Sequence, residues 1–141
     1  MKMIKWINGR PAHRAIAAGI LAVLTLLLLT AICLAERIRL AESSAQSTVN
    51  LMAGDDLVIT LTGNPTTGYI WEKVKDNKKI LQQQGDYQYI SSSSRVGAGG
   101  IFIFSFKAAV AGKTKLRLIY HRPFEKNVKP ARTYDLTVIS R

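Results

Sequence analysis

Apolar and polar residues alternate with a period of two through most of the chain after residue 56, and this pattern limits the fold more than any other feature. Alternation indicates half-buried β-strands, whereas an amphipathic helix repeats every three to four residues. The alternating segments are residues 57–62, 69–74, 101–110, 114–121 and 132–139, with two weaker runs in 80–90. The chain therefore predicts about seven short strands.

Turn-forming residues separate these segments. Glycine, proline, asparagine, aspartate and serine gather in residues 54–56, 63–68, 76–78, 91–100, 111–113 and 122–131. Short strands joined by turns indicate an all-β fold, an immunoglobulin-like antiparallel β-sandwich, over residues 48–141. Alternate connections of a Greek-key sandwich gather at one end, so several of these loops can share one surface.

The first 35 residues predict a targeting or anchoring segment. Residues 1–14 contain four basic residues and no acid, and residues 15–35 are uncharged and rich in leucine. A cleaved signal peptide has this pattern, but about 20 apolar residues are also enough for a membrane-spanning signal anchor. Both alternatives predict an N-terminal hydrophobic helix and export of the C-terminal part to a periplasmic or extracellular location. A third alternative makes Cys33 a lipidated cysteine. Residues 36–47, polar and rich in serine and alanine, predict a linker.

Residue types exclude several kinds of chemistry in the exported part. Cys33 is the only cysteine, which excludes a cysteine nucleophile, a cysteine zinc site and a redox motif after residue 35. His121 is the only histidine there, and Asp135 is the one residue that we consider as its orienting partner. One such pair provides neither a metal site nor an evident catalytic group. We therefore expect no enzyme activity, no metal and no cofactor.

The chain is basic, with a formal net charge of +11. Residues 36–141 contribute 16 basic and 9 acidic residues, which is +7. The basic residues are spread between strands and loops, without a run that interleaves them with aromatic residues, so we do not expect nucleic-acid binding. A basic domain of this kind favours an acidic protein partner.

Three loops contain residues that a plain connector does not need. In the first, at residues 63–69, Pro65 restricts the backbone. The second, at residues 91–100, contains glycines that let backbone approach a partner closely. The third combines the guanidinium of Arg122 with the apolar ring of Phe124. Taken alone, loop 1 is compatible with an ordinary turn, loop 2 with a flexible hairpin end, and Phe124 with a core residue. Together the three loops suggest one binding surface.

In their order and composition the three loops resemble the inhibitory loops of the chagasin-like family, which inhibits papain-like cysteine peptidases. The resemblance covers the chain from about residue 49 to its C-terminus. Phe124 stands where the family often has tryptophan. The matching residues are Asn64, Pro65, Thr66, Thr67, Gly68 and Tyr69 in loop 1, Gly97, Ala98, Gly99 and Gly100 in loop 2, and Arg122, Pro123 and Phe124 in loop 3.

The resemblance implies an immunoglobulin-like, monomeric inhibitor that blocks the active-site cleft of a papain-like cysteine peptidase reversibly and non-covalently. Thr66 and Thr67 would lie over the catalytic cysteine–histidine pair of the peptidase. The alternative is an exported immunoglobulin-like binding or adhesion module without inhibitory activity, which needs the fold but no special loop chemistry.

Overall fold

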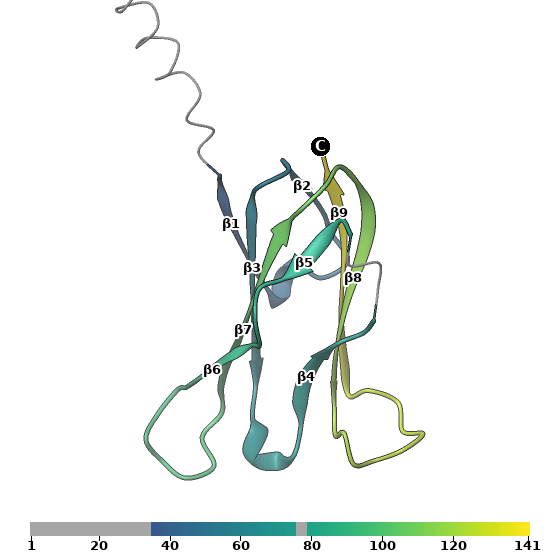
Figure 1. Cartoon of the computed structure of the whole chain (residues 1–141). Coiled ribbons are helices and arrows are strands. Elements are labelled where there is room, and N and C mark those ends of the chain that lie inside the picture. The colour runs from purple at the N-terminus through teal and green to yellow at the C-terminus, as the bar shows by residue number, and fades with distance from the viewer. Residues whose placement is uncertain (1–34, 76–78) are drawn as a thin grey trace, which may run out of the picture. The chain divides into compact units, whose positions relative to one another are not determined.

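A computed structural model describes residues 35–75 and 79–141 (Figure 1). The predicted N-terminal helix, with the signal, anchor and lipidation alternatives, lies outside these residues apart from Ala35. Within them, no helix has the length and apolar character needed to span a membrane.

The described residues form nine strands and two short 3₁₀ helices. The helices are η1 (Glu42–Ser44) and η2 (Pro65–Thr67). The strands are β1 (Arg37–Ala41), β2 (Thr48–Leu51), β3 (Asp56–Gly63), β4 (Ile70–Lys73), β5 (Leu81–Gln83), β6 (Gln88–Ser91), β7 (Gly100–Ala108), β8 (Gly112–His121) and β9 (Arg132–Ser140).

The strands form two sheets that enclose one core. One sheet has the order β1-β3-β7-β5, with β6 pairing to another part of β7, and the other has the order β2-β9-β8-β4. The all-β sandwich is therefore confirmed. Two details differ from the prediction: there are nine described strands rather than about seven, and the β1–β3 and β2–β9 pairs are parallel.

The linker predicted over residues 36–47 is wrong for most of that segment, because β1 and η1 lie there. Ile38 and Leu40 pack against the core, while Arg37 and Arg39, which alternate with them, are exposed. This is the period-two pattern of a strand, hidden by its shortness and its charges. The folded unit accordingly begins at Ala35, not near residue 48.

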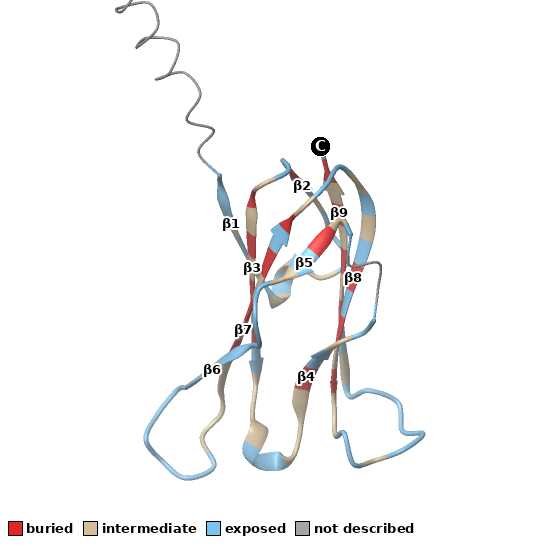
Figure 2. Cartoon of the chain, in the orientation of Figure 1, coloured by how far each residue is buried: buried red, intermediate tan, exposed pale blue. Residues whose placement is uncertain are grey.

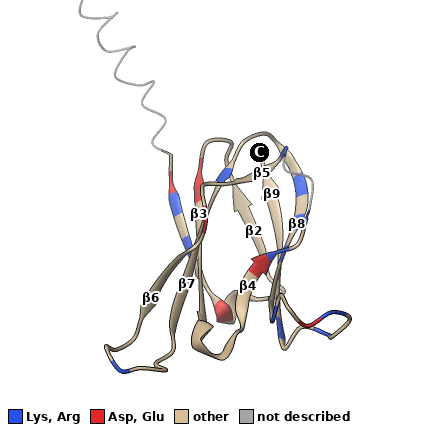
Figure 3. Ribbon diagram, turned by 60° about the horizontal axis from the view of Figure 1, so that its bottom comes forward, with Lys and Arg blue, Asp and Glu red and all other residues tan. Residues whose placement is uncertain are grey.

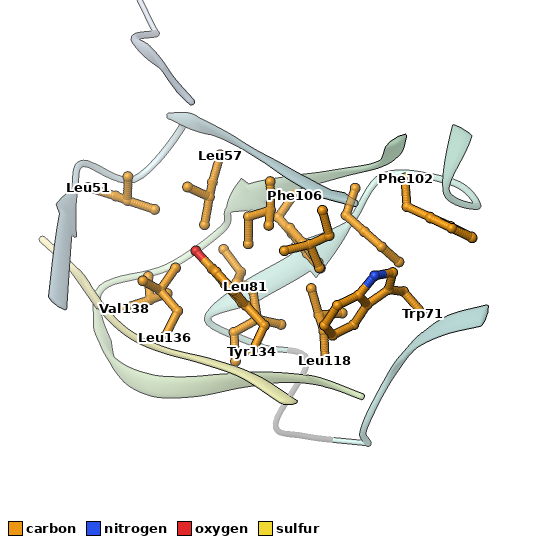
Figure 4. Packing of buried hydrophobic residues seen from close by; sticks show 14 of the residues in the cluster. Leu51, Leu57, Trp71, Leu81, Phe102, Phe106, Leu118, Tyr134, Leu136 and Val138 are labelled. Carbon is orange, nitrogen blue, oxygen red and sulfur yellow. The ribbon is translucent and has the colours of Figure 1, made fainter. Parts of the chain in front are cut away.

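Residues at alternate positions of the predicted strands are buried between the two sheets (Figures 2 and 4). Each large apolar side chain removed from water contributes about 1.5–3 kcal/mol. Tyr134 points its hydroxyl into this core, without a hydrogen-bond partner in the described part of the chain, and burial raises its pKa to about 12. The buried residues at alternate positions of the predicted strands are Leu57, Ile59, Leu61, Trp71, Phe102, Phe104, Phe106, Leu116, Leu118, Tyr120, Tyr134, Leu136 and Val138.

Strand register brings three connections to one end of the sandwich. The β3–β7 ladder ends at the pair Gly63–Gly100, and the β4–β8 ladder ends at Ile70–His121. The β3–β4, β6–β7 and β8–β9 connections therefore leave the sheets together (Figure 1). The C-terminus and the start of β1 lie at the opposite end.

Candidate functional site

Loop 1 (residues 63–69) is a turn that its own side chains hold closed. Asn64 caps η2, because its Oδ1 accepts hydrogen bonds from the backbone N of Thr66 at 3.1 Å and from Thr66 Oγ1 at 2.7 Å. Thr67 Oγ1 donates to the Asn64 carbonyl at 2.6 Å. Gly68 ends the turn in the left-handed region, with φ of 81°. An asparagine cap followed by proline is a sequence signature of such a start.

Aromatic residues of the core support the base of loop 1. The Tyr120 hydroxyl accepts a hydrogen bond from the backbone N of Asn64 at 2.8 Å. The Tyr120 ring also stacks on Tyr69, with 5.2 Å between ring centroids. Trp71 Nε1 donates to the Thr62 carbonyl at 2.9 Å, just before the loop. The buried side chains of Tyr120 and Trp71 therefore support the base of loop 1.

Hydrogen bonds also join the two ends of loop 2 (residues 91–100). The carbonyl of Gly99 accepts from both the backbone N and the Oγ of Ser92, at 2.9 Å and 2.6 Å. Gly97 has a positive φ of 82°, which favours glycine. At Gly100 an added Cβ would lie 2.1 Å from the Ile90 carbonyl oxygen, so no larger residue fits there. Hydrogen bonds and closely packed glycines therefore define the ends of this loop.

Loop 3 begins with a turn at residues 122–125. Arg122 Nη1 pairs with Glu125 Oε1 at 2.8 Å, and the backbone N of Glu125 donates to the Arg122 carbonyl at 3.1 Å. The hydrogen bond that Arg122 donates to Glu125 raises the pKa of Arg122 above its ordinary value, so this side chain stays charged. Phe124 is 70% exposed, which excludes the core role considered for it.

Hydrogen bonds join the three loops into one surface, with loop 1 at its centre. Asn64 Nδ2 donates to the Gly97 carbonyl of loop 2 at 2.8 Å. On the other side, Arg122 Nε donates to the Thr67 carbonyl at 3.2 Å. The Phe124 ring lies against Gly68, where an added Cβ would approach the ring to 3.1 Å. All three predicted segments are therefore adjacent in space.

The same surface is positively charged at its sides and neutral at its centre (Figure 3). Loop 1 contains no charged residue. Residues 91–100 and 122–131 together contain four basic residues and one acidic residue, or +3. The four are Arg95, Arg122, Lys126 and Lys129, and the acid is Glu125.

The one catalytic pair considered from the sequence is not assembled. His121 Nε2 lies 2.7 Å from Glu72 Oε2, on the neighbouring strand β4. Asp135 instead pairs with Arg117, at 2.5 Å. Among residues 35–75 and 79–141, no group of three or more histidine, cysteine, aspartate or glutamate side chains could hold a metal ion.

Sequence reasoning missed the residues beneath loop 1. Tyr120 lies in the strand predicted over residues 114–121, and its hydroxyl binds the backbone of Asn64. Arg132 and Glu42 also lie under this loop and contact Thr62. No local signal marks them, because the contacts join residues that are distant in the sequence.

The fold and the site define a class: a β-sandwich domain that presents three preformed loops at one end as a single binding surface. The sequence model of the family described as "Chagasin family peptidase inhibitor I42" matches residues 50–138. The chain therefore belongs to the chagasin family of peptidase inhibitors, which are not enzymes.

Known relatives agree with this assignment. The chain is 32% identical to amoebiasin-1 from Entamoeba histolytica over 100 residues, which cover 70% of this chain and 95% of the relative. It is 30% identical to chagasin from Trypanosoma cruzi over 83 residues, which cover 55% of this chain and 74% of chagasin. The crystal structure of the cysteine protease inhibitor EhICP2 from Entamoeba histolytica matches with a TM-score of 0.69 and 26% identity, over 77% of this chain and 98% of that one.

Proposed function

We propose that this chain is a reversible, non-covalent inhibitor of papain-like cysteine peptidases, and that loops 1, 2 and 3 together fill the active-site cleft. The observation that carries the proposal is that the three loops form one continuous surface, in which the Asn64–Gly97 and Arg122–Thr67 hydrogen bonds join loop 1 to loops 2 and 3. Membership in the chagasin family, whose relative EhICP2 is a cysteine protease inhibitor, supports this class of target.

Loop 1 is the part that covers the catalytic cysteine–histidine pair of the peptidase. Thr66 and Thr67 are exposed at its tip. Because the turn is already closed by Asn64 in the free protein, little conformational freedom is lost on binding. A rigid turn that does not align a carbonyl with the attacking thiolate is also a poor substrate. The loop therefore excludes water and substrate without being cleaved.

Loops 2 and 3 provide contact on either side of the tip. The backbone of residues 97–100 pairs with the cleft wall as a substrate strand does. The Gly97 carbonyl, which accepts one hydrogen bond from Asn64, retains a second lone pair for this pairing. Phe124 packs against an apolar or aromatic surface beside the cleft, and Arg122 stays charged next to it. None of the three loops contains an electrophile, so inhibition is non-covalent.

We also propose that the inhibitor acts outside the cytoplasm, as a monomer. The basic start and the apolar run of residues 1–35 support export, followed by cleavage or by retention as a membrane anchor. Mass spectrometry of the mature protein separates these alternatives, because cleavage removes the apolar run, retention preserves it, and lipidation adds mass at Cys33.

A titration tests the inhibitory function. The purified full chain is added to a papain-like peptidase, and residual activity is measured against a small peptide substrate. We expect inhibition that rises to completion near equimolar amounts and that reverses on dilution, with the inhibitor intact. Unchanged activity at a large molar excess would leave only the non-inhibitory binding module.

A further inference from the structure

Two charged residues outside the three loops meet directly beneath loop 1. Glu42 belongs to η1, and Arg132 is the first residue of β9. Arg132 Nη1 donates to Glu42 Oε1 at 2.7 Å, and each side chain is 37% exposed. A pair that is partly shielded from water is screened less by salt than a fully exposed one.

Both side chains also bind Thr62, the residue from which β3 enters loop 1. Glu42 Oε2 accepts hydrogen bonds from the backbone N of Thr62 at 3.3 Å and from its Oγ1 at 2.6 Å. Arg132 donates to the carbonyl and to Oγ1 of the same threonine. The β1–β3 ladder ends at the pair Ala41–Thr60, so these side chains bind backbone groups that lie beyond the end of β1.

Arg132 further connects this cluster to the cap of loop 1. Its guanidinium lies 4.4 Å from the ring centroid of Tyr120 and 5.1 Å from that of Trp71, within the range of a cation–π contact. The hydroxyl of that same Tyr120 accepts the hydrogen bond from the backbone N of Asn64. Continuous contacts therefore lead from Glu42 to Asn64.

We infer that Glu42 and Arg132 form a clamp that positions loop 1 for inhibition. For its effect on the peptidase, the inference rests on the proposed function. Glu42 precedes the family-matched residues 50–138, so the clamp makes the segment before β2 part of the inhibitor rather than a tether. Neither residue needs to touch the peptidase, because both act through Thr62 and Tyr120.

Two isosteric or charge-preserving variants break the clamp without removing its bulk. Glu42→Gln replaces one of the two accepting oxygens by an NH₂ donor. This NH₂ group faces the donors of either Arg132 or Thr62, so the hydrogen bonds to one of these residues are lost. Arg132→Lys keeps the charge but loses the planar fork and the ring stacking. Arg117→Gln is the matched control, since it removes an Arg–Asp pair between β8 and β9 that contacts none of the three loops.

The experiment uses the full chain and measures three quantities for each variant. They are the hydrogen-exchange rates of the backbone amides of residues 64 and 66–68 in the free protein, the inhibition constant against a papain-like peptidase, and the urea midpoint of unfolding. For Glu42→Gln and Arg132→Lys we expect loop 1 exchange and the inhibition constant each to rise about tenfold, the scale of one lost charge-assisted hydrogen bond. The double variant should be no worse than the worse single one, because both changes break the same clamp.

Exchange in β8 and β9 should stay unchanged, and Arg117→Gln should alter neither loop 1 nor inhibition. A merely structural role predicts instead that exchange rises throughout the domain and that the urea midpoint falls in step with it. That result, or unaltered loop 1 exchange, overturns the clamp. If the wild-type chain fails to inhibit, the proposed function fails, while the exchange data still decide whether the clamp exists.

Discussion

Loop 1 and loop 3 lie side by side at the same end of the sandwich, yet they are built in opposite ways. Loop 1 uses the side chains of Asn64 and Thr67 to bind its own backbone, so its polar groups fix its shape. Loop 3 leaves Phe124 70% exposed and free to contact a partner. Loop 1 contributes a prearranged conformation, and loop 3 contributes side-chain area for contact with a partner.

This difference separates two sources of affinity. A prearranged loop binds tightly because little order has to be imposed on binding, so a change that loosens it is visible in the free protein. An exposed anchor contributes only when a partner buries it, so its removal leaves the free protein unchanged. Substitutions in the two loops should therefore affect different observables.

The largest effect is expected at Gly68, where the two loops meet. Gly68→Ala places a side chain on a backbone with φ of 81° and within 3.1 Å of the Phe124 ring, so it strains loop 1 and displaces loop 3 together. We expect the inhibition constant to rise about a hundredfold, since a left-handed alanine alone costs roughly 1–2 kcal/mol. Titration of the variant against a papain-like peptidase measures this.

Gly85→Ala is the matched control, because Gly85 has a φ of 72° and open space around its added Cβ. It should cost similar stability in urea unfolding and leave inhibition unaffected. Equal losses of inhibition in both variants would mean that strain anywhere in the domain, rather than the junction of the loops, controls binding.

A smaller effect is expected at Asn64, whose side chain both caps loop 1 and joins it to loop 2. Asn64→Ala removes both roles and should raise the inhibition constant about thirtyfold. Asn64→Asp keeps the oxygen that accepts from Thr66 but cannot donate to the Gly97 carbonyl, so about a tenfold rise is expected. The two inhibition constants are compared under one set of conditions, and identical values would show that the cap adds nothing.

Phe124→Ala tests the other half of the comparison. We expect about a tenfold faster dissociation of the complex, measured by surface plasmon resonance, from the lost apolar contact. The urea midpoint should not move, because Phe124 is largely exposed in the free protein. Phe124→Trp should retain inhibition. A changed urea midpoint for the alanine variant would instead make Phe124 a structural residue.

The smallest effect concerns the charges beside loop 1. The net +3 of residues 91–100 and 122–131 should speed encounter with an acidic cleft. Raising the ionic strength from about 0.05 to 0.5 M should slow association about threefold and leave dissociation unaltered, as stopped-flow kinetics can measure. Salt-sensitive dissociation would indicate that these charges act within the complex rather than before it.

The core was predictable from the sequence because its signal is local. Alternation predicted strands over residues 57–62, 101–110 and 132–139, and Leu57, Phe104 and Leu136 at alternate positions of these strands are buried. The three loops were predictable as candidates because proline, glycine and arginine stand out in short segments. Asparagine before proline also indicates the cap that Asn64 forms.

The remainder depends on contacts between distant residues. Nothing near Glu42 indicates that it binds Thr62 and Arg132, which lie on β3 and β9. The strand β1 was missed because two apolar residues that alternate with arginines are too few for a clear pattern, and its stability comes from pairing with β3. Register alone, which places Gly63 opposite Gly100, brings loops 1 and 2 together.

The central claim is that the three loops occupy the active-site cleft, and one binding measurement tests it most directly. The affinity of the full chain is compared, by calorimetry, for a papain-like peptidase with an open cleft and for the same peptidase with a bulky peptide-like inhibitor attached to its catalytic cysteine. We predict tight binding to the open enzyme and none to the filled one. Equal affinity for both would place the contact surface elsewhere on the peptidase.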